Sequence, residues 1–232
     1  IDAEGEIIHR LEFDERPWSL HILPLGEIAL GLGRPRGGLL HLKLDGDRLI
    51  DTHLDLGDSP VCCGTGQSEI LLGHIDGGIT EINIDGKPES LPSITKETIE
   101  CMVKEESRLL IGTSEGSAIC FDNENISWSI DLEAEIENIC FSNRERAWFS
   151  TWSGRNGLIS LLDSDSGKII THLTLSARLR DIAVHEGFTV IGMDDGRLLV
   201  FESEMLARRI DSAPTEANNR SDLRDRLRAL RK

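Results

Sequence analysis

The chain has 232 residues, of which 39% are hydrophobic and 28% are charged, a balance that is typical of one folded domain in water. Its longest apolar runs hold only a handful of residues, far fewer than the roughly 20 that a membrane-spanning helix needs. Its formal net charge of −16 disfavours contact with nucleic acid phosphates and anionic lipid headgroups, so we expect neither a nucleic acid nor a membrane as partner.

The charge is unevenly distributed along the chain. Residues 220–232 carry six basic and two acidic side chains, whereas the rest of the chain carries a net charge of −20. An acidic body attracts a basic protein partner by electrostatic steering. A high negative charge also serves simply to keep a protein in solution, and both explanations fit the composition.

The five cysteines indicate a reducing environment. An odd number argues against a complete disulfide framework, and the adjacent Cys62 and Cys63 would point to opposite faces of a strand. The chain begins at Ile1 and no signal-peptide pattern follows. We therefore expect a cytoplasmic protein with reduced thiols.

Residues 6–13 resemble the last strand of a later segment. IDAEGEIIHRLEF at the start of the chain is similar to LLDSDSGKIITHLTL at 161–175, because each has an acidic, glycine-containing turn followed by an alternating strand. Residues 6–13 are thus predicted to be an outermost strand whose three inner strands are missing. Two interpretations follow: the chain is a fragment or processed form of a longer repeat protein, or this strand pairs with a neighbouring chain.

The middle of the chain is an internal repeat. Gly38, Gly77, Gly116, Gly157 and Gly196 are 39, 39, 41 and 39 residues apart, each between two short apolar runs. A period near 40 made of short strands is typical of the blades of a β-propeller, in which each copy buries its apolar face only against its neighbours. Five four-stranded blades are predicted at residues 17–57, 58–96, 97–134, 135–176 and 177–211. The fifth blade reads as LRDIAVH, FTVIGM, RLLVF and, at 205–211, MLARRID.

The C-terminal residues predict a linker and a helix. Residues 212–219 are polar and contain a proline, which favours a linker. Residues 220–232 predict a basic amphipathic helix with Leu223, Leu227 and Leu230 on one face. A helix of this length is marginal alone in water, so we expect these leucines to contact the propeller or another chain. Self-association is expected through this helix or through the strand at 6–13.

Residues 136–173 resemble a WD-type repeat. Ile136, Ile139 and the run Cys140-Phe141-Ser142 match the first strand of that pattern, and Leu162-Asp163 stand where its Trp-Asp pair ends a later strand. Phe121-Asp122 hold the same place in the preceding copy. No copy has Trp-Asp itself, so the hydrogen-bond network of regular WD repeats is not carried over. NENISWSID at 123–131 is similar to an outer strand of quinoprotein-like propellers. The resemblance implies a β-propeller that acts as a binding platform.

The turns between strands supply candidate binding residues. Trp152 precedes a turn with two extra residues, which places Trp152, Arg155 and Asn156 on an exposed loop as a binding anchor. The equivalent turns hold acidic residues that would form a collar for Ca²⁺ or a basic peptide, although acids beside glycine are also ordinary turn chemistry. The turn residues are His74, Asp76, Glu115, Asp194 and Asp195. Arg34 and Arg36 make a basic spot that would contact an acidic partner or the collar of a second copy.

The sequence offers little support for catalysis. Cys62, Cys101 and Cys140 recur every 39 residues in the strand nearest the axis, where three thiolates would converge on a metal or a compact side chain would fit a crowded centre. We favour the compact side chain, and predict no metal and no cofactor. The chain has no Gly-x-Ser-x-Gly elbow, and the glycine-rich residues 31–38 lack a phosphate-loop pattern.

We therefore predict a non-enzymatic scaffold that binds a protein partner through rim loops, with the C-terminal helix as a second contact. Two alternatives stay open. One is a ligand-binding, metal-binding or hydrolytic propeller with its site in the axial channel. The other is a quinoprotein-like extracytoplasmic assembly factor, against which the unpaired cysteines argue.

Overall fold

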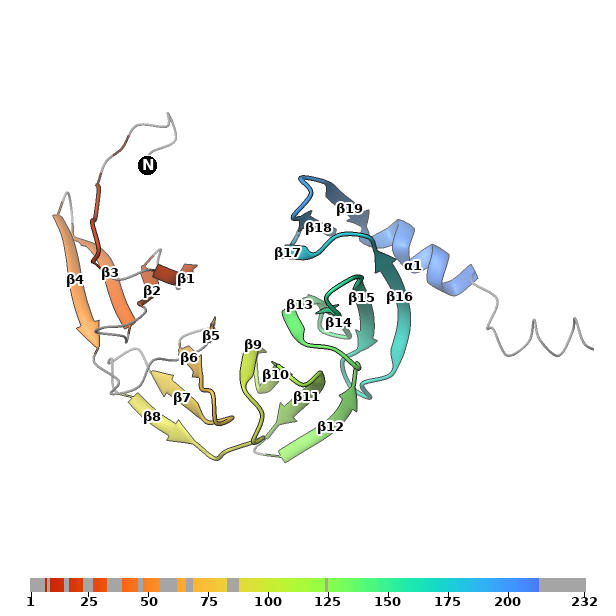
Figure 1. The fold of residues 1–232 in the computed structure, drawn as a ribbon, viewed down its shortest axis with the longest axis horizontal. Helices are drawn as coiled ribbons and strands as arrows, with labels where there is room; N and C mark the ends of the chain where they lie inside the picture. Colours follow the sequence, from red (N-terminus) through yellow and green to blue (C-terminus); the bar gives the residue numbers. More distant parts are fainter. Residues whose placement is uncertain are drawn as a thin grey trace, which may run out of the picture.

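The computed structural model describes residues 7, 9–14, 17–22, 27–32, 39–45, 48–54, 62–65, 69–82, 88–123 and 125–212. These residues form five antiparallel sheets in chain order, joined to one helix. Figure 1 shows the sheets around an arc, with the first sheet and the fifth sheet at its two ends.

Each of the first four sheets has four strands. The first contains β1 (Pro17–Ile22), β2 (Ile28–Leu32), β3 (Leu39–Asp45) and β4 (Arg48–Leu54). The second contains β5 (Cys62–Thr65), β6 (Ile70–Gly73), β7 (Ile79–Ile82) and β8 (Pro88–Leu91). The third contains β9 (Ile99–Glu105), β10 (Arg108–Thr113), β11 (Ser117–Asp122) and β12 (Asn125–Asp131). The fourth contains β13 (Ile136–Asn143), β14 (Arg146–Trp152), β15 (Gly157–Asp163) and β16 (Ile169–Leu175).

The arrangement is that of a propeller. Within each sheet the strands are paired in sequence order, so each sheet is a meander. The first strand of each sheet contacts the first strand of the next, and these strands line the inside of the arc in Figure 1, while β4, β8, β12 and β16 lie outside. The predicted all-β propeller of four-stranded units is confirmed for these four sheets.

The fifth sheet differs from the prediction. It has only β17 (Leu179–His185), β18 (Phe188–Met193) and β19 (Leu198–Glu202), and the predicted fourth strand at 205–211 is wrong. Those residues belong to helix α1 (Ser203–Ser212). Strong helix formers fill the segment, and Leu206 and Ile210, four residues apart, pack on the cluster between the fourth and fifth sheets. The segment is therefore helical, because a helix brings both Leu206 and Ile210 onto this cluster, and the short alternating pattern does not make it a strand.

The two ends of the chain depart from the prediction or lie outside the described residues. Of the predicted strand at 6–13, the described residues 7 and 9–13 form no strand. Instead, Phe13 packs against Leu30, Leu40 and Leu42 on the face of the first sheet that points away from the second. Of the predicted linker at 212–219, the structure describes only Ser212, which is the last residue of α1. The rest of the linker and the predicted helix at 220–232 lie outside the described residues.

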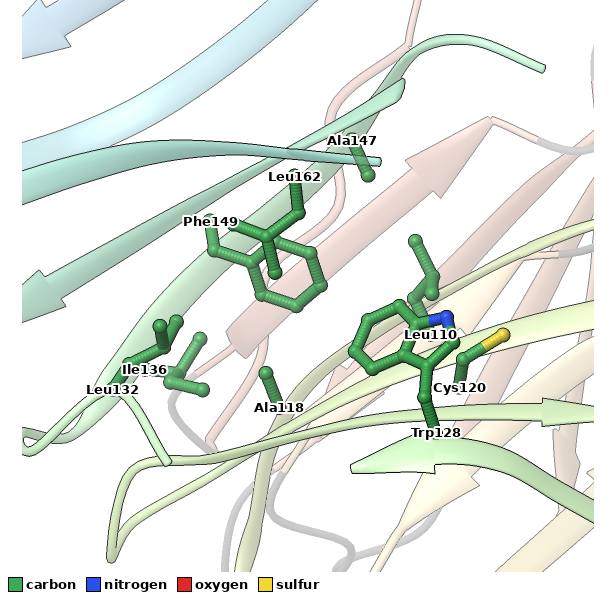
Figure 2. Packing of buried hydrophobic residues seen from close by; sticks show 9 residues of the cluster. All are labelled: Leu110, Ala118, Cys120, Trp128, Leu132, Ile136, Ala147, Phe149 and Leu162. Atoms are coloured by element: carbon green, nitrogen blue, oxygen red, sulfur yellow. The ribbon is translucent and has the colours of Figure 1, made fainter. Parts of the chain in front are cut away.

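The core lies between neighbouring sheets, as the repeat pattern requires. Because successive side chains of a strand point to opposite faces, Ala147 and Phe149 of β14 pack toward the third sheet and Trp148 packs toward the fifth. Figure 2 shows the cluster between the third and fourth sheets, in which the rings of Trp128 and Phe149 meet edge to face with centroids 6.3 Å apart. Each sheet therefore shields one apolar face of the next.

A repeated glycine sets how closely two sheets approach. A methyl group added at Gly112 would lie 2.5 Å from Cγ2 of Ile136, in the next sheet, and 2.8 Å from Sγ of Cys101. At Gly73 it would lie 2.8 Å from Cγ2 of Ile99 and 2.6 Å from Sγ of Cys62. Cys62 and Cys101 therefore occupy crowded positions, which agrees with their interpretation as compact packing residues. The predicted equivalence of Cys140 is wrong, because Cys140 pairs with Trp148 and not with a glycine.

Candidate protein-binding rim

One edge of the arc is built from turns and connections that are bonded to each other. We call it the turn rim, and it comprises residues 74–78, 92–100, 114–116, 132–137, 153–156, 176–181 and 194–197. In the second to fifth sheets, the turn between the second and third strands lies against the segment that connects to the next or preceding sheet. The backbone N–H of Leu132 donates to the carbonyl of Gly116 at 2.9 Å, that of Trp152 to Glu135 at 3.1 Å, and that of Asp194 to Arg178 at 3.0 Å. These bonds hold the exposed turns in fixed positions.

The turn rim is acidic. Its segments contain ten carboxylates and five Lys or Arg residues. Three of the five cations already contact rim carboxylates: Arg178 pairs with Glu137, Arg180 lies 3.9 Å from Asp194, and Arg197 lies 2.7 Å from Asp195. The surplus negative charge is thus available to a partner at this edge of the described structure.

A carboxylate cluster that the sequence did not reveal lies where the inner strands begin. Burial, reinforced by the nearby carboxylates of Glu135 and Glu137, raises the pKa of Glu100 above its ordinary value. Glu137 is almost fully buried and accepts a 2.6 Å hydrogen bond from Nε of Arg178. The cluster joins residues of β9, β13 and two connections, so only the folded arrangement of the sheets brings it together.

A second buried contact stiffens the turn at 114–116. The hydroxyl of the buried Thr113 donates to Glu97, and the hydroxyl of Ser117 donates to the same carboxylate at 3.0 Å. The backbone N–H of Ser117 donates in turn to Oγ1 of Thr113 at 2.9 Å. Glu97 therefore holds both ends of the turn that presents Glu115.

The structure brings Trp152, Arg155 and Asn156 together as the sequence predicts. Trp152 ends β14 and is half-buried, with its ring beside Gly157. Arg155 and Asn156 are exposed in the following turn, which is closed by hydrogen bonds of 3.1–3.3 Å between Ser153 and Asn156. The loop thus offers a partly covered aromatic ring next to a cation and an amide.

The other predicted collar residues also lie on the turn rim, but they are not equivalent. Asp76, Glu115, Asp194 and Asp195 are exposed. Asp76 accepts the backbone N–H of Gly78 at 3.0 Å and Asp195 that of Arg197 at 3.1 Å, which is ordinary turn chemistry. His74 is half-buried, and its Nε2 lies 2.9 Å from Oγ1 of Thr80. Its side chain therefore stabilises the turn and is only partly accessible to a binding partner. Arg34 and Arg36 lie outside the described residues.

The opposite edge carries a contact that the sequence analysis missed. Arg108 of β10 donates to the carbonyl of Arg144 at 2.9 Å and to Asp165 at 2.6 Å, both in the fourth sheet. Arg144 pairs with Glu106 of the third sheet. These bonds surround a polar hollow of about 60 Å³. They link two sheets, and their residues are 36 to 57 positions apart in the chain.

Metal-site geometry is not found in the described part of the chain. Within those residues, no three His, Cys, Asp or Glu side chains gather closely enough to hold a metal ion. In the described part of the chain, Cys62, Cys101, Cys120 and Cys140 form no disulfide bond. Burial raises the pKa of Cys120 and of Cys140 to about 11, so these two thiols are protonated at neutral pH and are poor nucleophiles.

Comparisons with known proteins identify the fold. No family model and no curated protein matches the sequence. By contrast, 687 chains of solved structures match the three-dimensional arrangement. The WD40 β-propeller domain of Doa1 has a TM-score of 0.65 and 13% identity over 84% of this chain and 67% of its own. A chain of the mitotic checkpoint complex has a TM-score of 0.68 and 11% identity over 87% and 69%.

A third match is BamB from Moraxella catarrhalis, with a TM-score of 0.56 and 12% identity over 81% of this chain and 61% of its own. These likenesses confirm the predicted β-propeller fold. Such a fold carries many functions, so the likeness assigns none. Among the described residues, no helix has both the length and the apolar character needed to cross a membrane.

Proposed function

We propose that this propeller is a non-enzymatic scaffold that binds another protein through its turn rim. The observation that carries the proposal is the loop after β14, where the half-buried Trp152 lies beside the exposed Arg155 and Asn156 on a rigid turn. Tryptophan and arginine next to ordered backbone are the residue types that dominate the binding energy of protein interfaces. A cytoplasmic location is part of the same proposal, and the free thiols support it.

The charge of the rim favours a basic partner. Asp76, Glu115, Asp194 and Asp195 are exposed carboxylates in the turns of the second, third and fifth sheets along the same rim. Charged rims speed association and select the partner by sign, while the aromatic anchor supplies most of the affinity. The partner is therefore expected to present Lys or Arg side chains around a pocket or flat patch that receives Trp152.

One observation favours the enzymatic alternative. The raised pKa of Glu100 is of the kind found at catalytic sites, although structural charge clusters produce it as well. The nearby Glu137 is already held by Arg178, and no nucleophile adjoins Glu100 in any hydrogen bond of the described structure. We therefore assign the cluster a structural role.

Site-specific photo-crosslinking tests the proposal. A photoreactive residue is placed at Arg155 and, as the matched control, at Lys168, an exposed turn residue on the opposite edge. We expect a discrete protein adduct from position 155, absent from position 168, that is lost in Trp152→Ala and weakened by added salt. Equal adducts from both positions, or an adduct that survives Trp152→Ala, would contradict a binding role for the rim.

The predicted C-terminal helix enters the proposal as a second contact. Leu223, Leu227 and Leu230 would form its apolar face.

A further inference from the structure

Among the residues that the structure describes, no neighbouring sheet covers one apolar face of the fifth sheet. Its other face, with Ile182, Ile191 and Met193, is buried against the fourth sheet. On the uncovered face, Phe188 of β18 is 48% exposed, and Leu198 and Val200 of β19 are 70% and 61% exposed. We call these three residues the open face. Contiguous exposed apolar side chains of this kind mark interaction surfaces.

The glycine in the second strand of the fifth sheet shows that the open face resembles the sheet faces that are covered by a neighbouring sheet elsewhere in the protein. Gly192 pairs with Asp181 as Gly112 pairs with Cys101, so the two glycines hold equivalent places in their sheets. At Gly73 and Gly112 an isoleucine of the next sheet fills the space above the glycine. At Gly192 the nearest described atoms to an added methyl group lie 3.9 Å and 4.0 Å away, and both belong to the fifth sheet itself. The position therefore has room for an aliphatic side chain.

Helix α1 turns the open face into a groove. A hollow of about 420 Å³ lies between Phe188 and Val200 of the sheet and Met205 and Arg209 of α1. Met205 is 49% exposed, so the helix contributes an apolar wall to the hollow. A groove with walls formed by a sheet and a helix fits a second helix laid beside the first.

We propose that residues 220–232 fold back beside α1 and insert Leu223, Leu227 and Leu230 into this groove. Helix α1 is 10 residues long, which is about 15 Å, and ends at Ser212. Residues 213–219 reach at most about 23 Å when extended, enough to return along α1. A connection of this length is within the usual range between two packed antiparallel helices.

Charge and stability favour this occupant. The segment is basic and the rest of the chain is strongly acidic, so docking brings opposite charges together. The groove itself is lined by one carboxylate, that of the exposed Glu202, and by one cation, that of Arg209. A helix of about 13 residues is marginal in water, and the groove provides the apolar contact that stabilises it.

A second copy is a poorer occupant. Head-to-tail packing would place the open face against the outer face of another copy's first sheet. In this structure Leu30, Leu40 and Leu42 of that sheet are already covered by Phe13. The intramolecular contact requires no such displacement. This inference gives the C-terminal helix a site on its own propeller in place of a contact with the partner, and it does not depend on the turn rim.

Limited trypsin digestion of the full chain tests the docking, because Arg224, Arg226 and Arg228 provide cleavage sites within the segment. Mass spectrometry follows the cleavage rate in the parent, in Val200→Asp on the sheet and in Leu227→Asp on the segment. We expect roughly tenfold faster cleavage in each variant than in the parent. The matched controls are Ile126→Asp, at an exposed aliphatic residue of β12, and Ala229→Asp, about 120° around the segment's helix from the centre of its leucine face; both should resemble the parent.

Each result bears on the proposal. Thermal melts by circular dichroism establish that the variants fold, and Leu227→Asp keeps the test valid if Val200→Asp unfolds. Equal cleavage rates in the parent, Val200→Asp and Leu227→Asp would overturn the docking. Protection that grows with protein concentration would identify a second copy as the occupant and overturn the intramolecular contact. Loss of rim crosslinking with protection intact would contradict only the proposed rim function.

Discussion

The indole Nε1 of Trp128, in the third sheet, donates a 2.8 Å hydrogen bond to the backbone carbonyl of Ser164, in the turn after β15 of the fourth sheet. The ring also lies on Gly167 of that turn, where a methyl group would come within 2.7 Å of it. One side chain thus joins the outer strand of one sheet to a turn of the next by both packing and hydrogen bonding.

Replacing Trp128 by Phe is expected to destabilise the fold by about 1–3 kcal/mol, because the Ser164 carbonyl loses its partner while most of the packing remains. Trp128→Ala should cost about 3–5 kcal/mol, since it also opens a cavity. Urea unfolding monitored by circular dichroism measures both. Trp152→Phe, on the rim, is the control and should change stability by less than about 1 kcal/mol. Equal losses at the two positions would contradict the special role of Trp128.

Gly112→Ala is expected to destabilise the protein by about 1–3 kcal/mol, because the new methyl group would overlap Ile136 of the fourth sheet and Cys101 of its own sheet. Gly192→Ala is its matched control, since the same change in the fifth sheet meets only distant atoms. Chemical denaturation should give a clearly lower free energy of unfolding for Gly112→Ala than for Gly192→Ala. A reversed order would refute the close approach at Gly112.

Glu100→Gln is expected to stabilise the fold at pH 7 and to have little effect near pH 4. Burial, with Glu135 and Glu137 nearby, raises the pKa of Glu100 above 4.5 in the folded state. Folding therefore favours the protonated form of Glu100. Its contribution to the free energy of unfolding is complete below pH 4.5 and is lost as the pH rises through the folded pKa, because the side chain must then carry a charge in a buried, acidic environment. Melting temperatures of parent and variant across this range provide the measurement. A gain that persists unchanged at low pH would point to a different cause.

Arg178→Met is expected to cost about 1–3 kcal/mol, because it leaves the buried Glu137 carboxylate without its cation. The double variant Arg178→Met with Glu137→Gln should recover much of the loss. Arg155→Met removes a cation from an exposed turn of the same rim and should be nearly neutral. Denaturant titrations of the three variants test this order, and failure of the double variant to recover would argue against the ion pair as the cause.

The sequence predicted the repeating features well because they depend on local chemistry. Glycine at fixed spacing, between runs of alternating apolar residues, locates the turns at Gly77, Gly116 and Gly196, all of which have positive φ. The same regularity places Trp152 and the acidic collar residues on one rim. Each of these features depends on a turn and its two flanking strands.

The features that were missed depend on contacts between distant segments. The pairing of Arg178 with Glu137 and that of Arg108 with Asp165 join residues more than 40 positions apart, and no periodicity predicts them. The segment at 205–211 was assigned to a strand because it follows three strands. Its conformation depends instead on Leu206 and Ile210, which reach the cluster between two sheets only when the segment is helical.

The glycine beneath the isoleucine gives the array a direction. The second and third sheets each offer a glycine, Gly73 or Gly112, to an isoleucine of the following sheet, Ile99 or Ile136, so these two junctions have the same two halves. A duplicated copy of the third sheet inserted at either of these junctions would meet matching surfaces on both sides without further substitution. Propellers of different size could therefore evolve from this sequence by unequal recombination alone, before any selection on the new interfaces.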